Sequence, residues 1–262
     1  VRGETQLPGT AEGLAALDAR NISRLFVSNN PTRRPAEYAT KLNNAGIDAT
    51  ADEVITAATS TVAYLEQNHE GEQLYLVGEE GLRDQLTEAG FAVDVAGEAA
   101  SNDRLPGVAV VSIDRAFDYD LLSQTLRVVR ADEIPIVGTD PDAVIPAAGG
   151  DIPGSGAMIA AVADVAEREP DAVLGKPHPL TRDLALDRLG VAPEDCLVVG
   201  DRLNTDIALG ASSGMTTVLV RSGVTDDARL VRATVTPDYV VDSLAQLPAI
   251  LDGDAERYQP AP

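Results

Sequence analysis

The chain has 262 residues and a formal net charge of −22, with 42 acidic side chains against 20 lysines and arginines. This charge disfavours nucleic acids and anionic membranes as partners. No stretch is long and apolar enough to span a bilayer and no signal peptide is visible, so we expect a cytoplasmic protein. The length allows one large hydrophobic core or two modest ones.

The composition is unusual in its acids and lysines. Aspartate outnumbers glutamate by 26 to 16, and lysine occurs only as Lys41 and Lys176. We interpret this as the salt-adapted surface of a haloarchaeal protein, with an ordinary acidic protein as the alternative. Aromatic residues make up 3% of the chain, so the core must consist of Ala, Val, Leu and Ile. The one cysteine, Cys196, lies in an apolar run and is expected to be a small core residue.

Strand and helix patterns alternate along the chain, which predicts the α/β class. The tail from 253 to 262 is expected to be frayed. The predicted strands span 24–27, 73–77, 108–113, 134–137, 172–174, 197–199, 216–220 and 239–241. The predicted helices span 35–45, 57–67, 79–89, 119–129, 155–167, 181–189, 206–212 and 243–250.

Two carboxylates, Asp201 and Asp206, follow the apolar run 196–199 and precede a helical pattern. Ligands of open α/β sheets bind at this end of the strands. Asp201 is a hard oxygen ligand suited to Mg²⁺, and Asp206 in a first helical turn complements the helix dipole. A plain turn or N-cap role is the alternative for such an aspartate.

Two further predicted strands end in polar residues. Lys176 follows an apolar run, and a lysine kept there by an arginine-rich chain fits a point charge that holds a phosphate oxygen. Ser28 offers a hydroxyl group, Asn29 and Asn30 offer amide donors, and successive backbone N–H groups can form an anion nest. A surface lysine and an ordinary loop are the alternatives.

Over nearly its whole length the sequence resembles haloacid dehalogenase (HAD) superfamily phosphatases of subfamily IIA. This subgroup includes the NagD-type nucleotidase, 4-nitrophenylphosphatases, phosphoglycolate phosphatase and pyridoxal phosphatase. The segment 200–207 is highly specific for the subgroup, whereas the Gly-Ser-Gly of 154–156 is weak on its own. The resemblance is carried by 2–4 with 7–9, 26–30, 77–82, 153–156, 175–177 and 200–207.

The resemblance implies a three-layer Rossmann-like core formed by 1–70 and 171–262, with an inserted α/β cap domain at 71–170 that covers the active site. It implies Mg²⁺-dependent hydrolysis of small phosphomonoesters through an aspartyl-phosphate. In this picture Ser28 orients the phosphoryl group with Asn29 and Asn30 beside it, Lys176 neutralises charge, Asp201 coordinates Mg²⁺, and Asp206 supports Lys176 or a metal-bound water.

The cap loop from Thr139 to Pro146 is rich in turn residues, and in the family the matching loop reaches toward the substrate. We therefore expect Asp142 to contact the substrate; a plain surface turn is the alternative. His69 follows a helix and is expected to be solvated. His178 lies close to Lys176 and either belongs to the site or caps the next helix.

The sequence departs from the family in one motif. The family's Asp-x-Asp-Gly, with nucleophile and general acid/base, stands just before the segment that corresponds to Arg2–Glu4, and it is absent here. We expect that the chain begins too late, through truncation or a mis-called start, and that the nucleophile lies upstream. An evolved loss is the alternative, which would leave a phospho-ligand binder or an assembly partner. As it stands, the chain should turn over phosphate esters poorly.

A nucleotide-binding doubly wound protein is disfavoured, because neither of the two common glycine-rich phosphate motifs is present. The expected partner is therefore a small-molecule phosphate ester. Sugar, nucleotide, glycolate and cofactor phosphates all stay open, as does a homo-oligomer formed through the cap.

Overall fold

The computed structural model describes residues 5–98, 105–131, 133–147 and 149–260. The segment Arg2–Glu4 of the family resemblance thus lies outside the described residues. The chain forms two compact units, each interrupted in sequence. The first consists of Val1–Phe26, Ala36–Val54 and Arg182–Pro262, and the second of Val27–Pro35 and Ile55–Thr181. A core at 1–70 and 171–262 with a cap at 71–170 stays a prediction.

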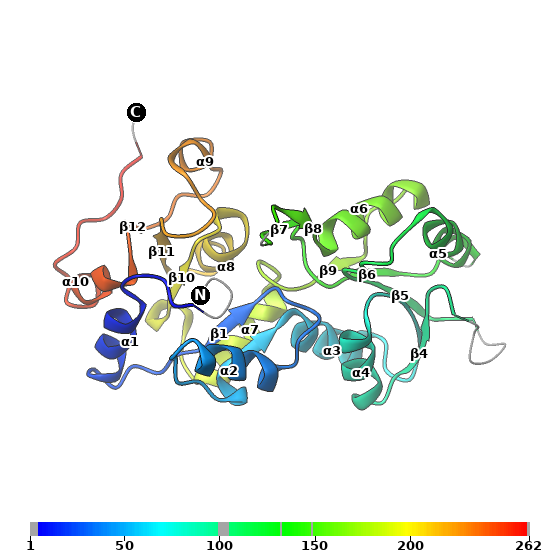
Figure 1. Ribbon diagram of the computed structural model, residues 1–262, viewed down its shortest axis with the longest axis horizontal. Coiled ribbons are helices and arrows are strands. Elements are labelled where there is room, and N and C mark those ends of the chain that lie inside the picture. Colours follow the sequence, from blue (N-terminus) through cyan, green and yellow to red (C-terminus); the bar gives the residue numbers. More distant parts are fainter. Residues whose placement is uncertain (1–4, 99–104, 132, 148, 261–262) are drawn as a thin grey trace. The chain divides into compact units, whose positions relative to one another are not determined.

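The second unit is built on a parallel five-stranded sheet with the strand order β4-β3-β5-β6-β9. Helices α3 and α4 cover one face of this sheet, and α5 and α6 cover the other (Figure 1). The strands are β3 (Gln73–Val77), β4 (Ala92–Val95), β5 (Val108–Val111), β6 (Ile136–Gly138) and β9 (Ala172–Val173). The helices are α3 (Ala57–Asn68), α4 (Glu80–Glu88), α5 (Tyr119–Ala131) and α6 (Ser155–Ala166).

Strand β3 shows why this unit has three layers. Its side chains alternate between the faces, and all of them are buried. Leu74 and Leu76 pack in the apolar cluster under α3 and α4, whereas Tyr75 and Val77 pack in the cluster under α5 and α6. A strand covered on both sides needs a continuous apolar run, which is what the sequence has here.

Strand β9 belongs to this five-stranded sheet, because Ala172 and Val173 pair with Val137 and Gly138 of β6. The sequence instead predicts that the core pattern resumes at 172–174. Two adjacent apolar residues carry no information about their partner strand, which only the register shows. A short antiparallel ribbon of β7 (Val144–Ile145) and β8 (Ile152–Pro153) also goes beyond the sequence prediction.

The first unit contains a parallel sheet of β10 (Leu197–Gly200), β11 (Thr216–Val220) and β12 (Tyr239–Val241), in that order. Apolar clusters lie on both faces of β11, with Val218 and Val220 in one and Leu219 in the other. A two-stranded sheet pairs β1 (Phe26–Ser28) with β2 (Val54–Thr56). The other α-helices are α1 (Thr10–Asp18), α2 (Pro35–Asn44), α7 (Pro179–Leu189), α8 (Ala208–Ala211), α9 (Asp227–Val231) and α10 (Leu247–Leu251). Short 3₁₀ turns span Ala51–Glu53, Pro193–Asp195 and Leu244–Gln246, and a π-turn spans Leu203–Ile207.

The prediction of an α/β fold with parallel strands is confirmed. The tail prediction is wrong for its described part, because the backbone N–H of Tyr258 donates to the carbonyl of Asp238 and Arg257 pairs with the Asp238 carboxylate at 2.7 Å. Within the part of the chain that the structure describes, no helix is both long and apolar enough to cross a membrane.

Candidate active site

Lys176 is held from three directions after the end of β9. Its backbone N–H donates to Asn29 Oδ1 at 2.6 Å, and Asn29 Nδ2 donates to the Lys176 carbonyl at 3.0 Å. Its ammonium group donates to the carbonyl of Val27 at 2.7 Å. These bonds join the end of β1 to the turn that follows β9, so the lysine predicted from the sequence lies beside the Ser28–Asn30 loop.

Gly175 makes this approach possible. Its φ of +68° is a conformation that L side chains rarely adopt. A Cβ atom here would also lie 2.8 Å from Asn29 Oδ1 and 3.1 Å from Asp140 Cβ. The glycine before Lys176 is therefore required by the backbone, and it brings the β6 and β9 ends into contact.

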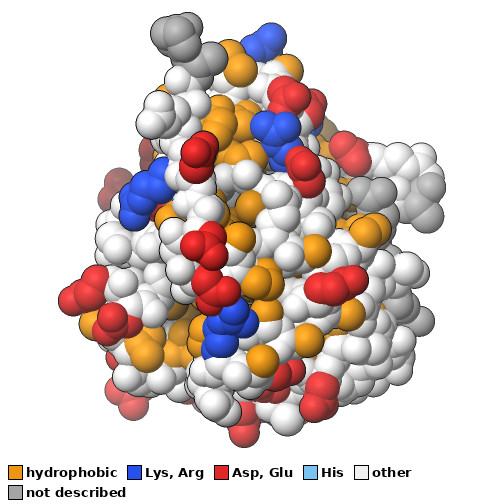
Figure 2. All heavy atoms as spheres, turned by 90° about the vertical axis from the view of Figure 1, so that its left-hand side faces the viewer, with side chains coloured by type: hydrophobic (Ala, Val, Ile, Leu, Met, Phe, Trp, Pro, Cys, Tyr) orange, Lys and Arg blue, Asp and Glu red, His pale blue; other side chains and the backbone are white. Residues whose placement is uncertain are grey.

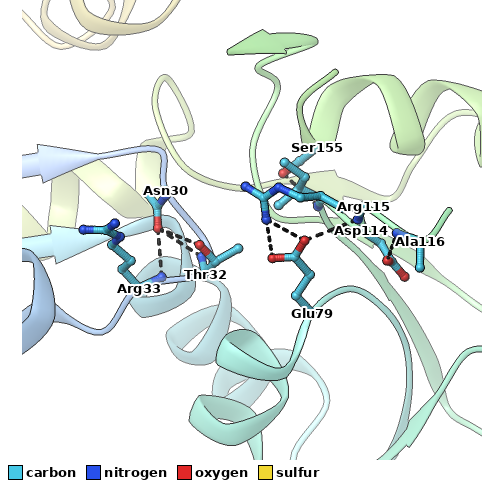
Figure 3. Close-up of polar contacts among 9 residues, drawn as sticks. Asn30, Thr32, Arg33, Glu79, Asp114, Arg115, Ala116 and Ser155 are labelled. Carbon is cyan, nitrogen blue, oxygen red and sulfur yellow. Dashed lines mark hydrogen bonds and ion pairs between the residues drawn. The ribbon is translucent and has the colours of Figure 1, made fainter. Parts of the chain in front are cut away.

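The Ser28–Asn30 loop is an organised turn. Asn30 Oδ1 accepts hydrogen bonds from the backbone N–H groups of Thr32 at 3.1 Å and Arg33 at 2.8 Å (Figure 3). Ser28 Oγ accepts from the backbone N–H of Asn30 at 3.3 Å. The side-chain oxygen of Asn30 thus shapes the loop, and that of Asn29 accepts from Lys176. The roles of both residues beside a phosphate stay predictions.

The loop after β6 is buried at its start, which excludes a plain surface turn there. Thr139 and Asp140 are 0% and 2% exposed. Asp140 accepts hydrogen bonds from Thr139 Oγ1 at 3.2 Å and from the backbone N–H of Asp142 at 3.1 Å. Burial raises the pKa of the Asp140 carboxyl to about 7, opposed by a hydrogen bond from Ser155 and reinforced by the charge of Asp142.

In the first unit, Asp201 and Asp206 lie just after β10. Asp206 is 6% exposed, and its Oδ2 accepts from the backbone N–H groups of Asp201 and Arg202, both at 3.1 Å. Asp201 Oδ2 accepts from the backbone N–H of Val224 at 2.8 Å, and the Asp201 carbonyl accepts from Thr225 Oγ1 at 2.6 Å. Asp206 therefore shapes the loop that presents Asp201.

The predicted site residues are divided between the two units. Asp201 and Asp206 belong to the first unit. Ser28, Asn29, Asn30, Lys176 and Asp142 belong to the second unit, in which the bonds of Asn29 and Lys176 join the 28–30 loop to the turn after β9.

The sequence reasoning overlooked three charged residues that the second unit places at strand ends. Asp140 and the ion pair of Glu79 with Arg115 all follow apolar strands. Their position just after a strand is the signal that the sequence carries for these three residues. The sequence does not show which strands are neighbours, and it is the sheet order that brings the ends of β3 and β5 side by side.

The structure agrees with one of the alternatives expected for His178 but not with the expectation for His69. His178 Nδ1 accepts from the backbone N–H of Leu180 at 3.2 Å, so the capping alternative is the one observed at the start of α7. His69 is not solvated: its side chain is 12% exposed and bonds Glu72 at 2.9 Å. Cys196 is a free, half-buried cysteine next to β10, and burial raises the pKa of its thiol.

The described residues contain no group of three acidic, histidine or cysteine side chains that could hold a metal ion. Asp201 nevertheless has suitable donor chemistry. Val224 occupies Oδ2, and among the described residues Oδ1 makes no hydrogen bond. Mg²⁺ commonly uses one or two carboxylates together with waters and substrate phosphate, so this free oxygen fits such an ion as one ligand.

Comparisons with known proteins agree with this arrangement. A haloacid dehalogenase-like hydrolase family model matches residues 1–92, and a HAD-hydrolase-like model matches 173–247. An acid sugar phosphatase of Staphylococcus saprophyticus is 32% identical over 246 residues, which cover 94% of this chain and 92% of that protein.

Solved structures show the same likeness. A p-nitrophenyl phosphatase from Archaeoglobus fulgidus has a TM-score of 0.83 and 33% identity over 94% of this chain and 93% of that one. NagD from E. coli has a TM-score of 0.80 and 28% identity over 94% and 93% of the two chains. The chain therefore belongs to the haloacid dehalogenase-like hydrolases, in subfamily IIA with the NagD and p-nitrophenyl phosphatases.

Proposed function

We propose that this protein hydrolyses small hydroxylated phosphomonoesters of the sugar phosphate type with the aid of Mg²⁺. The observation that carries the proposal is the anchored ammonium group of Lys176 beside the Ser28–Asn30 loop. The staphylococcal relative is named an acid sugar phosphatase, which supports the hydroxylated substrate class.

Lys176 supplies the fixed positive charge. Its ammonium group donates to the carbonyl of Val27 at 2.7 Å, which anchors the positive charge at the end of β1. Because the two Asn29 bonds engage the Lys176 backbone, the position of the ammonium group does not depend on its own flexible stem alone. Phosphoryl transfer depends chiefly on such positioning and charge stabilisation.

The other predicted residues would supply the rest of the chemistry. The Ser28 hydroxyl group would donate to a phosphoryl oxygen. A carboxylate nucleophile, expected in the family's Asp-x-Asp-Gly motif, would form the new P–O bond as the ester P–O bond breaks. The second aspartate of that motif would give its proton to the departing alcohol oxygen, and water would then hydrolyse the aspartyl-phosphate. Asp201 would hold Mg²⁺, which when bound neutralises charge on the phosphoryl oxygens. Asp206 would keep the Asp201 loop in place through the two backbone bonds at 3.1 Å.

The test is to express the protein with the in-frame codons that precede Val1 and to assay phosphate release from a sugar phosphate with and without Mg²⁺. We expect Mg²⁺-dependent hydrolysis, and an Asp-x-Asp-Gly within the restored segment. Substituting the first aspartate of that motif by asparagine should abolish release. A stop codon upstream with no such motif in frame, or hydrolysis that persists in the asparagine variant, would overturn the proposal.

We also propose that the protein works in the cytoplasm of a salt-accumulating cell. The support is its charge of −22 and the dispersal of its carboxylates. The face shown in Figure 2 carries separate Asp and Glu side chains with few Lys and Arg between them. A dispersed acidic surface of this kind keeps a protein soluble when salt screens its charges.

A further inference from the structure

The five-stranded sheet of the second unit has a switch point between β3 and β5. The chain leaves β3 through α4 to reach β4 on one side, and it leaves β5 through α5 to reach β6 on the other. Ligands of parallel α/β sheets bind in the crevice at the carboxyl ends of the strands at such a point. Glu79 follows β3 there, and Arg115 follows β5.

Glu79 fixes the Arg115 side chain and leaves most of its hydrogen-bonding capacity unused. Arg115 Nη1 donates to both carboxylate oxygens of Glu79 at 2.6 Å, and the Arg115 backbone N–H donates to Oε1 at 3.3 Å (Figure 3). Among the described residues, Nε and Nη2 make no hydrogen bond. Since a guanidinium has five N–H donors in a rigid plane, a pre-oriented set of donors is left on a side chain that is 59% exposed.

This pair lies next to the loop of the proposed phosphate site, within the same unit. Gly81, in the first turn of α4, packs against Thr32 so closely that a Cβ atom would lie 2.1 Å from the Thr32 carbonyl oxygen. Thr32 in turn belongs to the turn closed by Asn30. Figure 3 shows Glu79 and Arg115 on one side and Asn30 with Thr32 and Arg33 on the other. The pair can therefore reach the part of a ligand that extends away from its phosphate.

The charges around Arg115 decide what chemistry this ligand part would have. Glu79 neutralises the guanidinium. Asp114, the preceding residue, is 8% exposed and accepts from the backbone N–H of Ala116 at 2.8 Å, with its carboxyl turned away from the guanidinium (Figure 3). Asp140 and Asp142 follow the neighbouring strand. A second anionic group would meet this acidic surrounding, whereas a neutral hydroxyl group can accept from the free N–H groups.

We propose that Glu79 and Arg115 form the specificity-determining pair that binds the hydroxyl groups of the leaving group, with Arg115 as donor and Glu79 holding it in place. The inference rests on the proposed function, because it concerns the same ligand. It adds the residues that select a polyol over an apolar or acidic leaving group.

The test measures equilibrium binding, so it does not depend on turnover. The probes are two phosphonates of equal chain length, butyl phosphonate and dihydroxybutyl phosphonate, titrated into the full chain in the presence of Mg²⁺. We expect the wild-type protein to bind the dihydroxybutyl compound about tenfold more tightly, the effect of one hydrogen bond to a charged group. Arg115→Met should remove this preference and Glu79→Gln should reduce it, with butyl phosphonate affinity unchanged.

The control is Arg130→Met, which breaks another exposed arginine–glutamate pair, with Glu167, at the carboxyl end of α5. It should keep the preference, and equal thermal midpoints would show that all variants fold. A preference that survives Arg115→Met, an equal loss for both phosphonates, or tighter binding of a carboxypropyl phosphonate would overturn the inference. If the wild-type protein shows the binding preference but the phosphate-release assay described above detects no hydrolysis, the result would count against the proposed function alone.

Discussion

Asn29 and Lys176 hold each other through two backbone-directed hydrogen bonds across 147 positions of sequence, at 2.6 and 3.0 Å. Asn29 Oδ1 accepts from the backbone N–H of Lys176, and Asn29 Nδ2 donates to the backbone carbonyl of Lys176. The catalytic lysine that we propose is thus positioned by a residue whose side chain, among the described residues, bonds the Lys176 backbone.

Replacing Asn29 should show whether this residue positions Lys176 for phosphate binding or only stabilises the fold. Asn29→Ala removes both bonds, so we expect a loss of about 1–3 kcal/mol in the free energy of unfolding, measured by urea titration. Asn43 provides a matched control, since its side chain bonds the backbone carbonyl and N–H of Ala49 in the same way, at 2.9 and 3.0 Å. Asn43→Ala should cost similar stability, but only Asn29→Ala should weaken binding of inorganic phosphate. Equal phosphate affinities in the two variants would contradict the positioning role.

Substitutions of Asp201 and Lys176 should change different properties of the enzyme, namely Mg²⁺ affinity and turnover. In a form of the protein that hydrolyses phosphate esters, Asp201→Asn should weaken Mg²⁺ affinity by more than the roughly 10–100-fold typical of outer-shell losses, because it removes the proposed direct ligand. Lys176→Ala should instead lower turnover by about 100–1000-fold while Mg²⁺ affinity changes little. Steady-state kinetics across a Mg²⁺ series separate the two. Wild-type Mg²⁺ dependence in Asp201→Asn would reject the ligand assignment.

Asp140 should make stability depend on pH. Burial raises the pKa of its carboxyl from 3.8 to about 7, so the folded chain binds a proton that the unfolded chain releases. Stability from this group is therefore complete below pH 3.8 and is lost as the pH rises to about 7, by roughly 4 kcal/mol at most. Asp140→Asn should remove this slope and stabilise the protein at neutral pH.

The measurement is the free energy of unfolding between about pH 3 and about pH 8, roughly one unit beyond each end of the expected loss. Asp120→Asn on the exposed side of α5 serves as the control and should leave the slope unchanged. An Asp140→Asn profile that runs parallel to the wild-type profile would show that the carboxyl stays ionised in the fold.

Salt should stabilise the fold. Its 42 acidic groups face 20 basic ones, so the folded surface repels itself at low ionic strength. The Debye length falls from about 10 Å at 0.1 M to about 3 Å at 1 M, which screens this repulsion. Exposed ion pairs such as Arg20–Asp252 are also screened, but each contributes at most about 1 kcal/mol. The thermal midpoint should therefore rise across a KCl series, and a flat or falling midpoint would remove the halophile interpretation.

The sequence by itself determined the elements whose pattern is local. Strands at 73–77, 216–220 and 239–241 have the predicted bounds, because continuous apolar runs of buried parallel strands differ from their polar flanks. The family resemblance likewise rested on short motifs at strand ends, and the comparisons confirm it. Lys176 could be chosen because lysine is so rare in this chain.

Only the tertiary structure decided which strand ends meet. Strand β9 joins the sheet of β6, and Asn29 closes on Lys176, through pairings between distant segments that no local periodicity encodes. The same holds for Glu79 and Arg115, which become partners because β3 and β5 are neighbours in the sheet order. Asp140 shows the energetic side of this rule. Its position after a strand is visible in the sequence, but its raised pKa comes from burial, which depends on everything packed around it.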